Sequence, residues 1–376
     1  MTKRPYIYAD NAATTSLDSE ALDAMLPFLK ESFGNPSSLY SRGQGVKRAM
    51  QDAREKIASC IGALPEEIYF TSGGTESDNW ALKGIQAKRI LYSAAEHHAI
   101  INSCLALKNS GKKIKKLPVN QYAQVAADSL SSSIKCDDLV SIMMANNEIG
   151  SMNDIGSLAQ IVHAAGGIFH TDAVQAVGHI PIDVHELGLD MLSASAHKFN
   201  GPKGIGFLFV RKGIHLVNFM DGGQQESGHR AGTENVPAIV GMATALKNNC
   251  LNMSNHTEKL SRIVCCFYET ICQAIPDVTW NGDPLYRLPG HISLSLPDIS
   301  GESMLHLLDL RGIAVSTGAA CNSKSTKISH VLTAIGLARE LSRGTLRISF
   351  GANNSEADAL TVANEIISMY GKLKEK

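Results

Sequence analysis

Short apolar runs alternate with stretches of helical apolar spacing between about residues 65 and 210. The runs have the length of buried strands and lie at residues 67–71, 89–93, 114–119, 139–144, 167–172, 190–193 and 205–210. Residues 155–165, between two of these runs, have the spacing of a helix. Repeated alternation of strand and helix predicts an α/β fold with a mainly parallel sheet of seven strands.

The rest of the chain follows a different pattern. We expect one long helical stretch at 235–275, interrupted near 248–255. Strands are predicted at residues 278–281, 291–296 and 344–350, and helices at 303–310 and 355–370. A chain of 376 residues with 44% hydrophobic positions is long enough for more than one core. We therefore predict a large domain at 15–250 and a smaller α+β domain made of 1–14 and 251–376.

Composition excludes several classes of function. The 35 basic and 36 acidic residues give a net charge of −1, so we expect no direct binding of nucleic acid. No apolar run reaches the roughly 18 residues of a membrane span, and the first residues lack the apolar core of a secretory signal. The eight cysteines form no C-x-x-C pair, which argues against a metal site and favours a reduced, cytoplasmic protein.

Lys198 stands at the point where a strand gives way to a turn. It lies in SASAHKFNGPKGIG, residues 193–206, between an apolar run and two glycine-containing turns. A lysine fixed there can be desolvated, which lowers its pKa and makes its amine a nucleophile for Schiff-base chemistry. The alternative is a surface lysine beside a hairpin, because most lysines are exposed.

Asp172 weakens that alternative. It ends the apolar run GIFHTD, and Gln175 follows three residues later. An acid at the carboxyl end of a strand lies in the crevice where open α/β sheets bind ligands, and a buried carboxylate there needs a cationic partner. The ring nitrogen of pyridoxal phosphate (PLP) is such a partner, and an aspartate on that nitrogen accompanies a lysine Schiff base in PLP enzymes.

The motifs HTDAVQ and SASAHKFNGPKG resemble the PLP core of the class V aminotransferases, which have fold type I, and most of all the cysteine desulfurases. DNAATT, NNEIG, RAGTEN and LRISFG follow the same family in the expected order over nearly the whole chain. The resemblance implies that Lys198 holds PLP, that Asp172 keeps the ring nitrogen protonated, and that Gln175 bonds the phenolic oxygen. It implies L-cysteine as the substrate.

The phosphate of the cofactor has a predicted site of its own. Gly73, Gly74 and Thr75 connect a strand to a helix N-terminus, where free backbone N–H groups favour an anion. The chain lacks a P-loop and a G-x-G-x-x-G motif, so ATP and NAD fit poorly. The resemblance implies that Gly74, Thr75, Ser195 and His197 bind this phosphate. It also implies that Thr233 of RAGTEN caps the phosphate of a partner subunit, which requires a homodimer.

Three further residues take their roles from the resemblance. His97 stacks on the PLP ring and moves protons, for which a flat side chain that titrates near neutrality is suited. Asn147 contacts the cofactor or the substrate carboxylate, with Asn146 as the alternative. Arg347 binds the substrate carboxylate, because an arginine on an apolar strand needs an anionic partner. Arg343 is the alternative to Arg347.

Cys321 decides which reaction this scaffold performs. It lies within STGAACNS, and the cysteine desulfurases carry their persulfide-forming cysteine on such a loop. The resemblance implies sulfur transfer to Cys321, and then to an iron–sulfur scaffold protein or a tRNA-thiolation enzyme. The alternatives are a class V aminotransferase, a selenocysteine lyase, or a sulfur carrier without catalysis. An aminotransferase has no need of Cys321.

Overall fold

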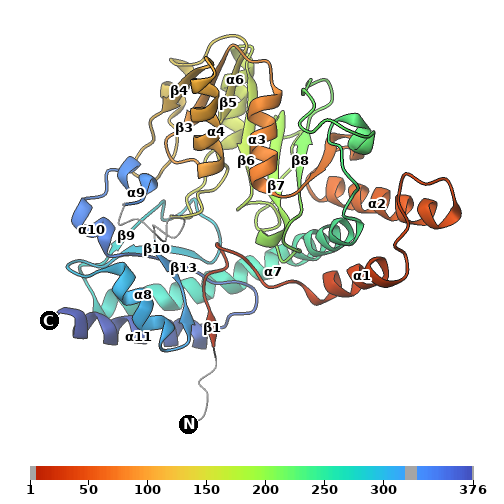
Figure 1. The fold of residues 1–376 in the computed structure, drawn as a ribbon. Helices are drawn as coiled ribbons and strands as arrows, with labels where there is room; N and C mark the ends of the chain where they lie inside the picture. The colour runs from red at the N-terminus through yellow and green to blue at the C-terminus, as the bar shows by residue number, and fades with distance from the viewer. Residues whose placement is uncertain (1–5, 318–327, 375–376) are drawn as a thin grey trace.

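A computed structural model describes residues 6–317 and 328–374. A seven-stranded sheet lies in the larger part of the molecule, the upper part in Figure 1, and its strand order is β2-β8-β7-β6-β5-β3-β4. The strands are β2 (Ile68–Thr71), β3 (Arg89–Ser93), β4 (Lys113–Leu117), β5 (Asp138–Ser141), β6 (Ile168–Asp172), β7 (Met191–Ser195) and β8 (Gly206–Val210). Strands β3 to β7 pair in parallel, and β8 runs antiparallel to both neighbours. The predicted α/β fold with a mainly parallel sheet is confirmed.

Both faces of this sheet are covered, and apart from β4 its strands are buried at almost every position. Side chains alternate between the faces, so Leu139 packs with the helices α3 and α4 while Val140 packs on the opposite side. Met191 likewise packs with α3 and α4, and Leu192 packs on the same side as Val140. Helices of this part are α1 (Ser19–Lys30), α2 (Ser41–Cys60), α3 (Gly74–Gly84), α4 (His98–Asn109), α5 (Ala127–Ser131) and α6 (Ile155–Ala164).

A single helix, α7 (Val236–Ala274), links the large sheet to the C-terminal part of the chain. Its first half packs into the core beside the sheet, and Leu260, Ile263 and Phe267 belong to a second core. The predicted interruption at 248–255 is wrong. The Nδ2 atom of Asn249 donates to the backbone oxygens of Phe199 and Ala245, so tertiary contacts keep this polar stretch helical.

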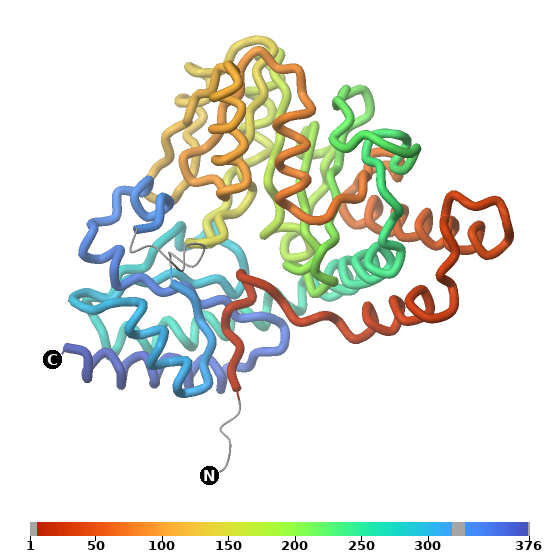
Figure 2. Tube along the Cα trace, viewed as in Figure 1, coloured from red at the N-terminus to blue at the C-terminus, as the bar shows by residue number. Residues whose placement is uncertain are grey.

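The second core lies under a four-stranded sheet of order β12-β13-β10-β9, with a short parallel pair β1–β11 beside it. These strands are β1 (Ile7–Tyr8), β9 (Thr279–Trp280), β10 (His291–Ser295), β11 (Ile313–Ala314), β12 (Ser316–Thr317) and β13 (Thr345–Ser349). The helices are α8 (Gly301–Asp309), α9 (His330–Ala334), α10 (Arg339–Arg343) and α11 (Glu356–Lys374). The N-terminal segment lies beside these C-terminal elements and then crosses to the large sheet (Figure 2). The domain limits at 14/15 and 250/251 stay predictions.

The strand directions determine where a ligand can bind. Because β3, β5, β6 and β7 are parallel, the segments that follow them leave the sheet at one edge. The turn after β2 joins them there, since β2 and β7 both run antiparallel to β8. Such an edge is the usual ligand site of an open α/β sheet. Among the helices of the described part of the chain, none has both the length and the apolar character to span a membrane.

Candidate active site

A cavity of about 580 Å³ lies at this edge, a volume typical of a small-molecule site. It is lined from segments that are far apart in the sequence: the N-terminal segment, the start of α3, the ends of the parallel strands and β13. Ten of the predicted site residues line it: Gly74, Thr75, His97, Asn147, Asp172, Gln175, Ser195, His197, Lys198 and Arg347. The fold therefore brings together residues that the sequence spreads over more than 270 positions.

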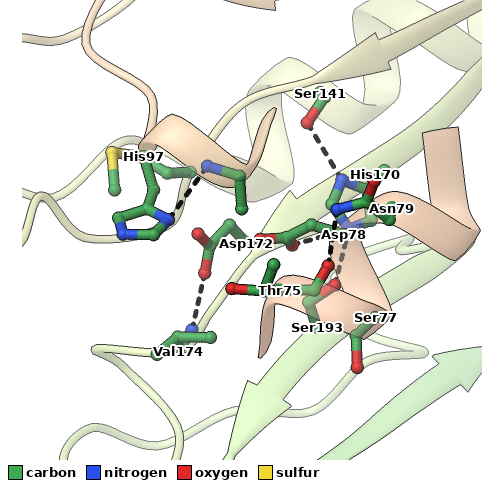
Figure 3. Close-up of polar contacts among 12 residues, drawn as sticks. Thr75, Ser77, Asp78, Asn79, His97, Ser141, His170, Asp172, Val174 and Ser193 are labelled. Atoms are coloured by element: carbon green, nitrogen blue, oxygen red, sulfur yellow. Dashed lines mark hydrogen bonds and ion pairs between the residues drawn. The ribbon is translucent and has the colours of Figure 1, made fainter. Parts of the chain in front are cut away.

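Asp172 is a buried carboxylate at the end of β6, with only 5% of its surface exposed. Its Oδ1 atom accepts a hydrogen bond from the backbone N–H of Val174 at 2.9 Å (Figure 3). Burial raises the pKa of Asp172, while the nearby His97 and Lys198 act in the opposite direction. A carboxylate in this position gains from a cation placed in the cavity.

His97 is the N-cap residue of α4, and its ring lies near Asp172 (Figure 3). Its Nδ1 atom accepts from the backbone N–H of Ala99 at 3.2 Å, which leaves the proton of a neutral ring on Nε2. Burial lowers the pKa of His97 in spite of the opposing charge of Asp172. A neutral imidazole with a fixed tautomer is suited to accept or pass on a proton.

Lys198 ends the short turn Ala196–Lys198 that follows β7. Its Nζ atom donates to the backbone oxygens of Ala12 and Ala13 at 2.6 and 2.8 Å. The Nε2 atom of Gln175 also donates to the oxygen of Ala12, at 3.0 Å. The N-terminal segment therefore holds the lysine at the cavity, a role for its backbone that the sequence had not revealed.

The start of α3 forms one end of the cavity. Gly73 has a φ of 144°, and a Cβ atom at Gly74 would lie 2.5 Å from the side chain of Val174. Glycine at these positions lets the helix N-terminus approach Ser195. Burial and the neighbouring Lys198 and Lys203 lower the pKa of His197 to about 4. Helix N–H groups, a hydroxyl and an imidazole offer hydrogen-bond donors for a phosphate at this end.

Arg347 lies on β13 and lines the cavity, and only 5% of its surface is exposed. Its Nη1 atom donates to the backbone oxygen of Asn147 at 3.0 Å, and its Nε atom has no hydrogen-bond partner among the described residues. Arg343 is exposed and does not line the cavity. A substrate carboxylate at this end would meet Arg347.

The two asparagines of the NNEIG turn have different surroundings. Asn147 lines the cavity. Asn146 is buried, with Nδ2 donating to the oxygen of Ala95 and Oδ1 accepting from the N–H groups of Glu148 and Ile149. Its amide is therefore occupied in shaping the turn, and the geometry favours Asn147 as the residue that meets a ligand.

One predicted site residue among the described residues does not line the cavity. Thr233 is exposed and lies outside it, so its role toward a partner subunit stays a prediction. Neighbouring Arg230 pairs with Glu76 of α3 at 2.8 Å and thereby attaches the RAGTEN segment to the cavity wall. Cys321 lies outside the described residues.

Asp78 is a site residue that the sequence analysis missed. It is buried on α3. A carboxylate oxygen of Asp78, a carboxylate oxygen of Asp172 and a ring nitrogen of His97 all lie within 4.8 Å of one another (Figure 3). Its Oδ1 atom is 3.8 Å from Nε2 of the buried His170, whose pKa is lowered to about 3 by desolvation. Burial also raises the pKa of Asp78 well above its ordinary value. The available signal was its spacing, one helical turn after Gly74.

PLP fits these residues at three points. Asp172 is a buried carboxylate whose pKa is raised by burial, the start of α3 offers donors for a phosphate, and Lys198 lines the same cavity. Arg347 lines the same cavity and offers a guanidinium group to the carboxylate of an amino-acid substrate. The donor set matches a cofactor with a basic ring nitrogen and a phosphate.

Comparison with known proteins agrees with this geometry. The model of the aminotransferase class-V family matches residues 7–362, and the chain belongs to that family. Its members depend on PLP, so the predicted cofactor is confirmed. The cysteine desulfurase IscS of Methanosarcina thermophila is 44% identical over 99% of this chain and 94% of its own length. The predicted resemblance to the cysteine desulfurases within the family is thereby confirmed.

Solved structures give the same result. A NifS-like protein aligns with a TM-score of 0.92 and 34% identity, covering 98% of this chain and all of its own. A structure described as SspA in complex with cysteine aligns with a TM-score of 0.82 and 32% identity, covering 92% of this chain and 99% of its own.

Proposed function

We propose that this chain is a cysteine desulfurase that converts L-cysteine to L-alanine and takes the sulfur onto Cys321 as a persulfide. The observation that carries the proposal is the cavity itself, where Lys198, Asp172 and Arg347 meet although they come from three separate elements. An amine for the cofactor, an acid for its ring and a cation for a carboxylate are the groups that this reaction needs.

The cofactor is assigned to the residues at the strand ends. Lys198 holds it through the amine, Asp172 keeps its ring nitrogen protonated, and Gln175 bonds its phenolic oxygen. Gly74, Thr75, Ser195 and His197 would hold its phosphate, and His97 would stack on its ring. When bound, PLP withdraws electrons from the amino acid and so weakens the bonds around the α-carbon.

The substrate is oriented by its carboxylate. Arg347 and Asn147 bind that group, which fixes the orientation of L-cysteine in the cavity. His97 lies where a neutral imidazole can take up and return the protons of the reaction.

Sulfur transfer needs the thiolate of Cys321, because a thiolate is the nucleophilic form of cysteine. The thiolate attacks the substrate sulfur, an S–S bond forms as the C–S bond breaks, and the remaining three-carbon unit takes up a proton to become L-alanine. Replacement of Cys321 by serine tests this step. Cys321→Ser should retain PLP and bind L-cysteine, yet neither carry a persulfide nor release alanine at a useful rate.

Mass spectrometry after mixing with L-cysteine should find one added sulfur on the Cys321 peptide of the native chain. The seven other cysteines should stay unmodified. Full alanine turnover in Cys321→Ser would show instead that sulfide leaves directly, as in a lyase.

We also propose a homodimer in which Thr233 reaches the phosphate of the partner subunit, since it is exposed and lies outside the cavity of its own chain. A chain with Thr233→Ala and Arg230→Ala should regain part of its activity when it forms heterodimers with a Lys198→Ala chain. Confirmed heterodimers without recovery would assign Thr233 to its own subunit.

The persulfide is passed on, in our proposal, to an iron–sulfur scaffold protein or a tRNA-thiolation enzyme in the cytoplasm. The relatives named IscS support the first acceptor. Seven of the cysteines are free thiols in the described part, which is typical of a reducing compartment. Capture of proteins that receive labelled sulfur from the persulfidated enzyme would identify the acceptor.

A further inference from the structure

Glu148 is a partly buried acid next to the active cavity for which the proposed reaction has no role. It follows Asn147 in the NNEIG turn, and its backbone N–H donates to Oδ1 of Asn146 at 2.9 Å. Its Oε2 atom accepts from the Oγ atom of Ser329 at 2.5 Å. The turn that presents Asn147 to the cavity therefore also holds a side chain from the C-terminal part of the chain.

Ser329 uses every hydrogen-bonding position of its hydroxyl. It donates to Glu148, and its oxygen accepts from the backbone N–H groups of Val331 and Leu332 at 3.0 and 3.4 Å as the N-cap of α9. A hydroxyl has one proton to donate, so this proton is committed to Glu148. The start of α9 is thereby joined to the NNEIG turn.

A second contact fixes the same point. The Nε2 atom of His330 donates to the backbone oxygen of Glu96 at 2.8 Å, and the ring packs on His98 with centroids 4.8 Å apart. Val331 and Leu332 bury their side chains in a cluster with Ala95 and Ile149. The start of α9 is therefore attached to the two segments that present His97 and Asn147 to the cavity.

We infer that Glu148 and Ser329 are positioning residues for sulfur transfer: they fix the chain eight residues after Cys321 to the turn that presents Asn147 to the substrate. The inference rests on the proposed function, because it assigns the pair to the step in which Cys321 takes the sulfur. Glu148 acts through Ser329 and contacts neither the substrate nor the cofactor in this assignment.

The groups around Glu148 explain why the contact should depend on pH. Burial raises the pKa of Glu148 to about 7, and the Ser329 hydroxyl and the Arg347 guanidinium act in the opposite direction. The ring of His291 faces the Glu148 backbone, but burial lowers its pKa to about 3, so it stays neutral. Near neutral pH, Glu148 thus changes between a carboxylate, which only accepts a hydrogen bond, and an acid, which competes as a donor.

The test compares substitutions that keep or remove the contact in the PLP-loaded enzyme. Ser329→Ala and Glu148→Ala should slow persulfide formation on Cys321 at least tenfold in a single turnover at pH 8. Binding of L-cysteine, followed by the absorbance change of the cofactor, should stay within threefold of native. Ser329→Thr keeps both the cap and the donor and should restore the rate.

Ser300→Ala is the matched control for the loss of a helix cap. Ser300 caps α8 by accepting from the N–H of Ser303 at 3.3 Å, away from the cavity lining. Ser300→Ala should lower the melting temperature, as Ser329→Ala does, but it should leave the rate of persulfide formation unchanged. Equal rates for Ser329→Ala and the native enzyme would overturn the inference, as would an equal slowing by Ser300→Ala.

Glu148→Gln isolates the charge, because it retains the size of the side chain. The ratio of native to Glu148→Gln persulfide rates should rise from near one at pH 6 to a plateau above pH 8. A ratio that stays constant across this range would overturn the inference. If the native chain itself forms no persulfide, the proposed function is wrong. This outcome differs from failure of the inference on Glu148 and Ser329, in which the native chain does form the persulfide.

Discussion

Arg347 is paired with Asp10 across the junction between the N-terminal segment and β13. The Nη2 atom of Arg347 donates to Oδ1 of Asp10 at 2.9 Å, and Oδ2 of Asp10 accepts from the Oγ atom of Ser316 at 2.9 Å. The acid neutralises the buried guanidinium and fixes its plane, as a buried arginine requires. The side chain also lines the cavity, so a carboxylate bound there would meet its guanidinium group.

Removal of Arg347 should therefore weaken substrate binding more than cofactor binding. Arg347→Ala should raise the KM for L-cysteine by about 10–100-fold, since a hydrogen bond to a charged group contributes about 1.5–3 kcal/mol. The absorbance of bound PLP should be unchanged. Steady-state kinetics with Arg343→Ala as the control checks the choice between the two arginines, because Arg343 is exposed. A raised KM in Arg343→Ala alone would reverse the assignment.

Lys198 should be the only lysine that binds the cofactor covalently. After reduction with borohydride and denaturation, the native chain should keep the mass of the cofactor on the Lys198 peptide, and Lys198→Ala should lose it. Lys203 is a suitable control, because it lines the same cavity but is exposed. Lys203→Ala should still be labelled at Lys198. Label on another lysine in the Lys198→Ala chain would refute the prediction.

Ionisation of Asp172 should destabilise the cofactor-free chain but stabilise the chain that holds PLP. Burial raises its pKa, so its contribution to the stability of the cofactor-free chain is present below the ordinary aspartate pKa and is lost as pH rises through the raised value. The cationic ring nitrogen of bound PLP should remove the free-energy cost of ionising the buried Asp172 carboxylate. Asp172→Asn should thus melt higher than native at pH 8 without PLP, but gain less when PLP is added.

Thermal melts with and without PLP at pH 5.5 and 8 measure this difference. PLP should bind the Asp172→Asn chain about 10–100-fold more weakly, as expected for the loss of one charge-assisted hydrogen bond. Asp128→Asn, at an exposed position of α5, should behave as native. An equal gain from PLP in native and Asp172→Asn chains would argue against contact between Asp172 and the ring nitrogen.

The strands and most helices could be predicted from the sequence because local apolar patterns specify them. The limits of β3, residues 89–93, were predicted correctly, since the run is buried and bounded by polar turns. The apolar run at 139–144 predicts one strand, but β5 ends at Ser141. Residues 142–144 are apolar because they are buried next to the cavity, where Met143 is part of the lining. Burial and strand pairing cannot be separated by hydropathy alone.

The unpredicted features all depend on contacts between distant segments. The helix α7 continues through an asparagine-rich stretch because Asn248 donates to Glu20 of α1 and Asn249 donates to the backbone oxygen of Phe199. Asp78 belongs to the site because β6 places Asp172 beside α3. Glu148 belongs to the NNEIG motif, yet its partner Ser329 is 181 positions away. Motifs identified the residues that meet the ligand, and the fold was needed to find those that support them.

The last prediction concerns the stability of the Glu148→Gln chain. The pKa of Glu148 is raised from 4.5 to about 7. The folded chain therefore holds this proton more tightly than the unfolded chain, and the stability that results is full below pH 4.5 and is lost as pH rises through 7. At 1.36 kcal/mol for each pKa unit, ionisation of Glu148 above pH 7 costs up to about 3 kcal/mol.

A glutamine avoids that cost, so Glu148→Gln should melt several degrees above native at pH 8 and close to native at pH 5.

Glu76→Gln should have the opposite effect on stability and melt below native at pH 8. Burial raises the pKa of Glu76, but hydrogen bonds from Arg230 and Ser72 outweigh it and lower the pKa, so its ionised form is stabilising. Thermal melts of both PLP-loaded variants over pH 5–8.5 check the opposite signs. A more stable but slower Glu148→Gln enzyme would show that this acid is kept for positioning and not for folding. A Glu148→Gln chain less stable than native at pH 8 would mean that the charge holds the fold together.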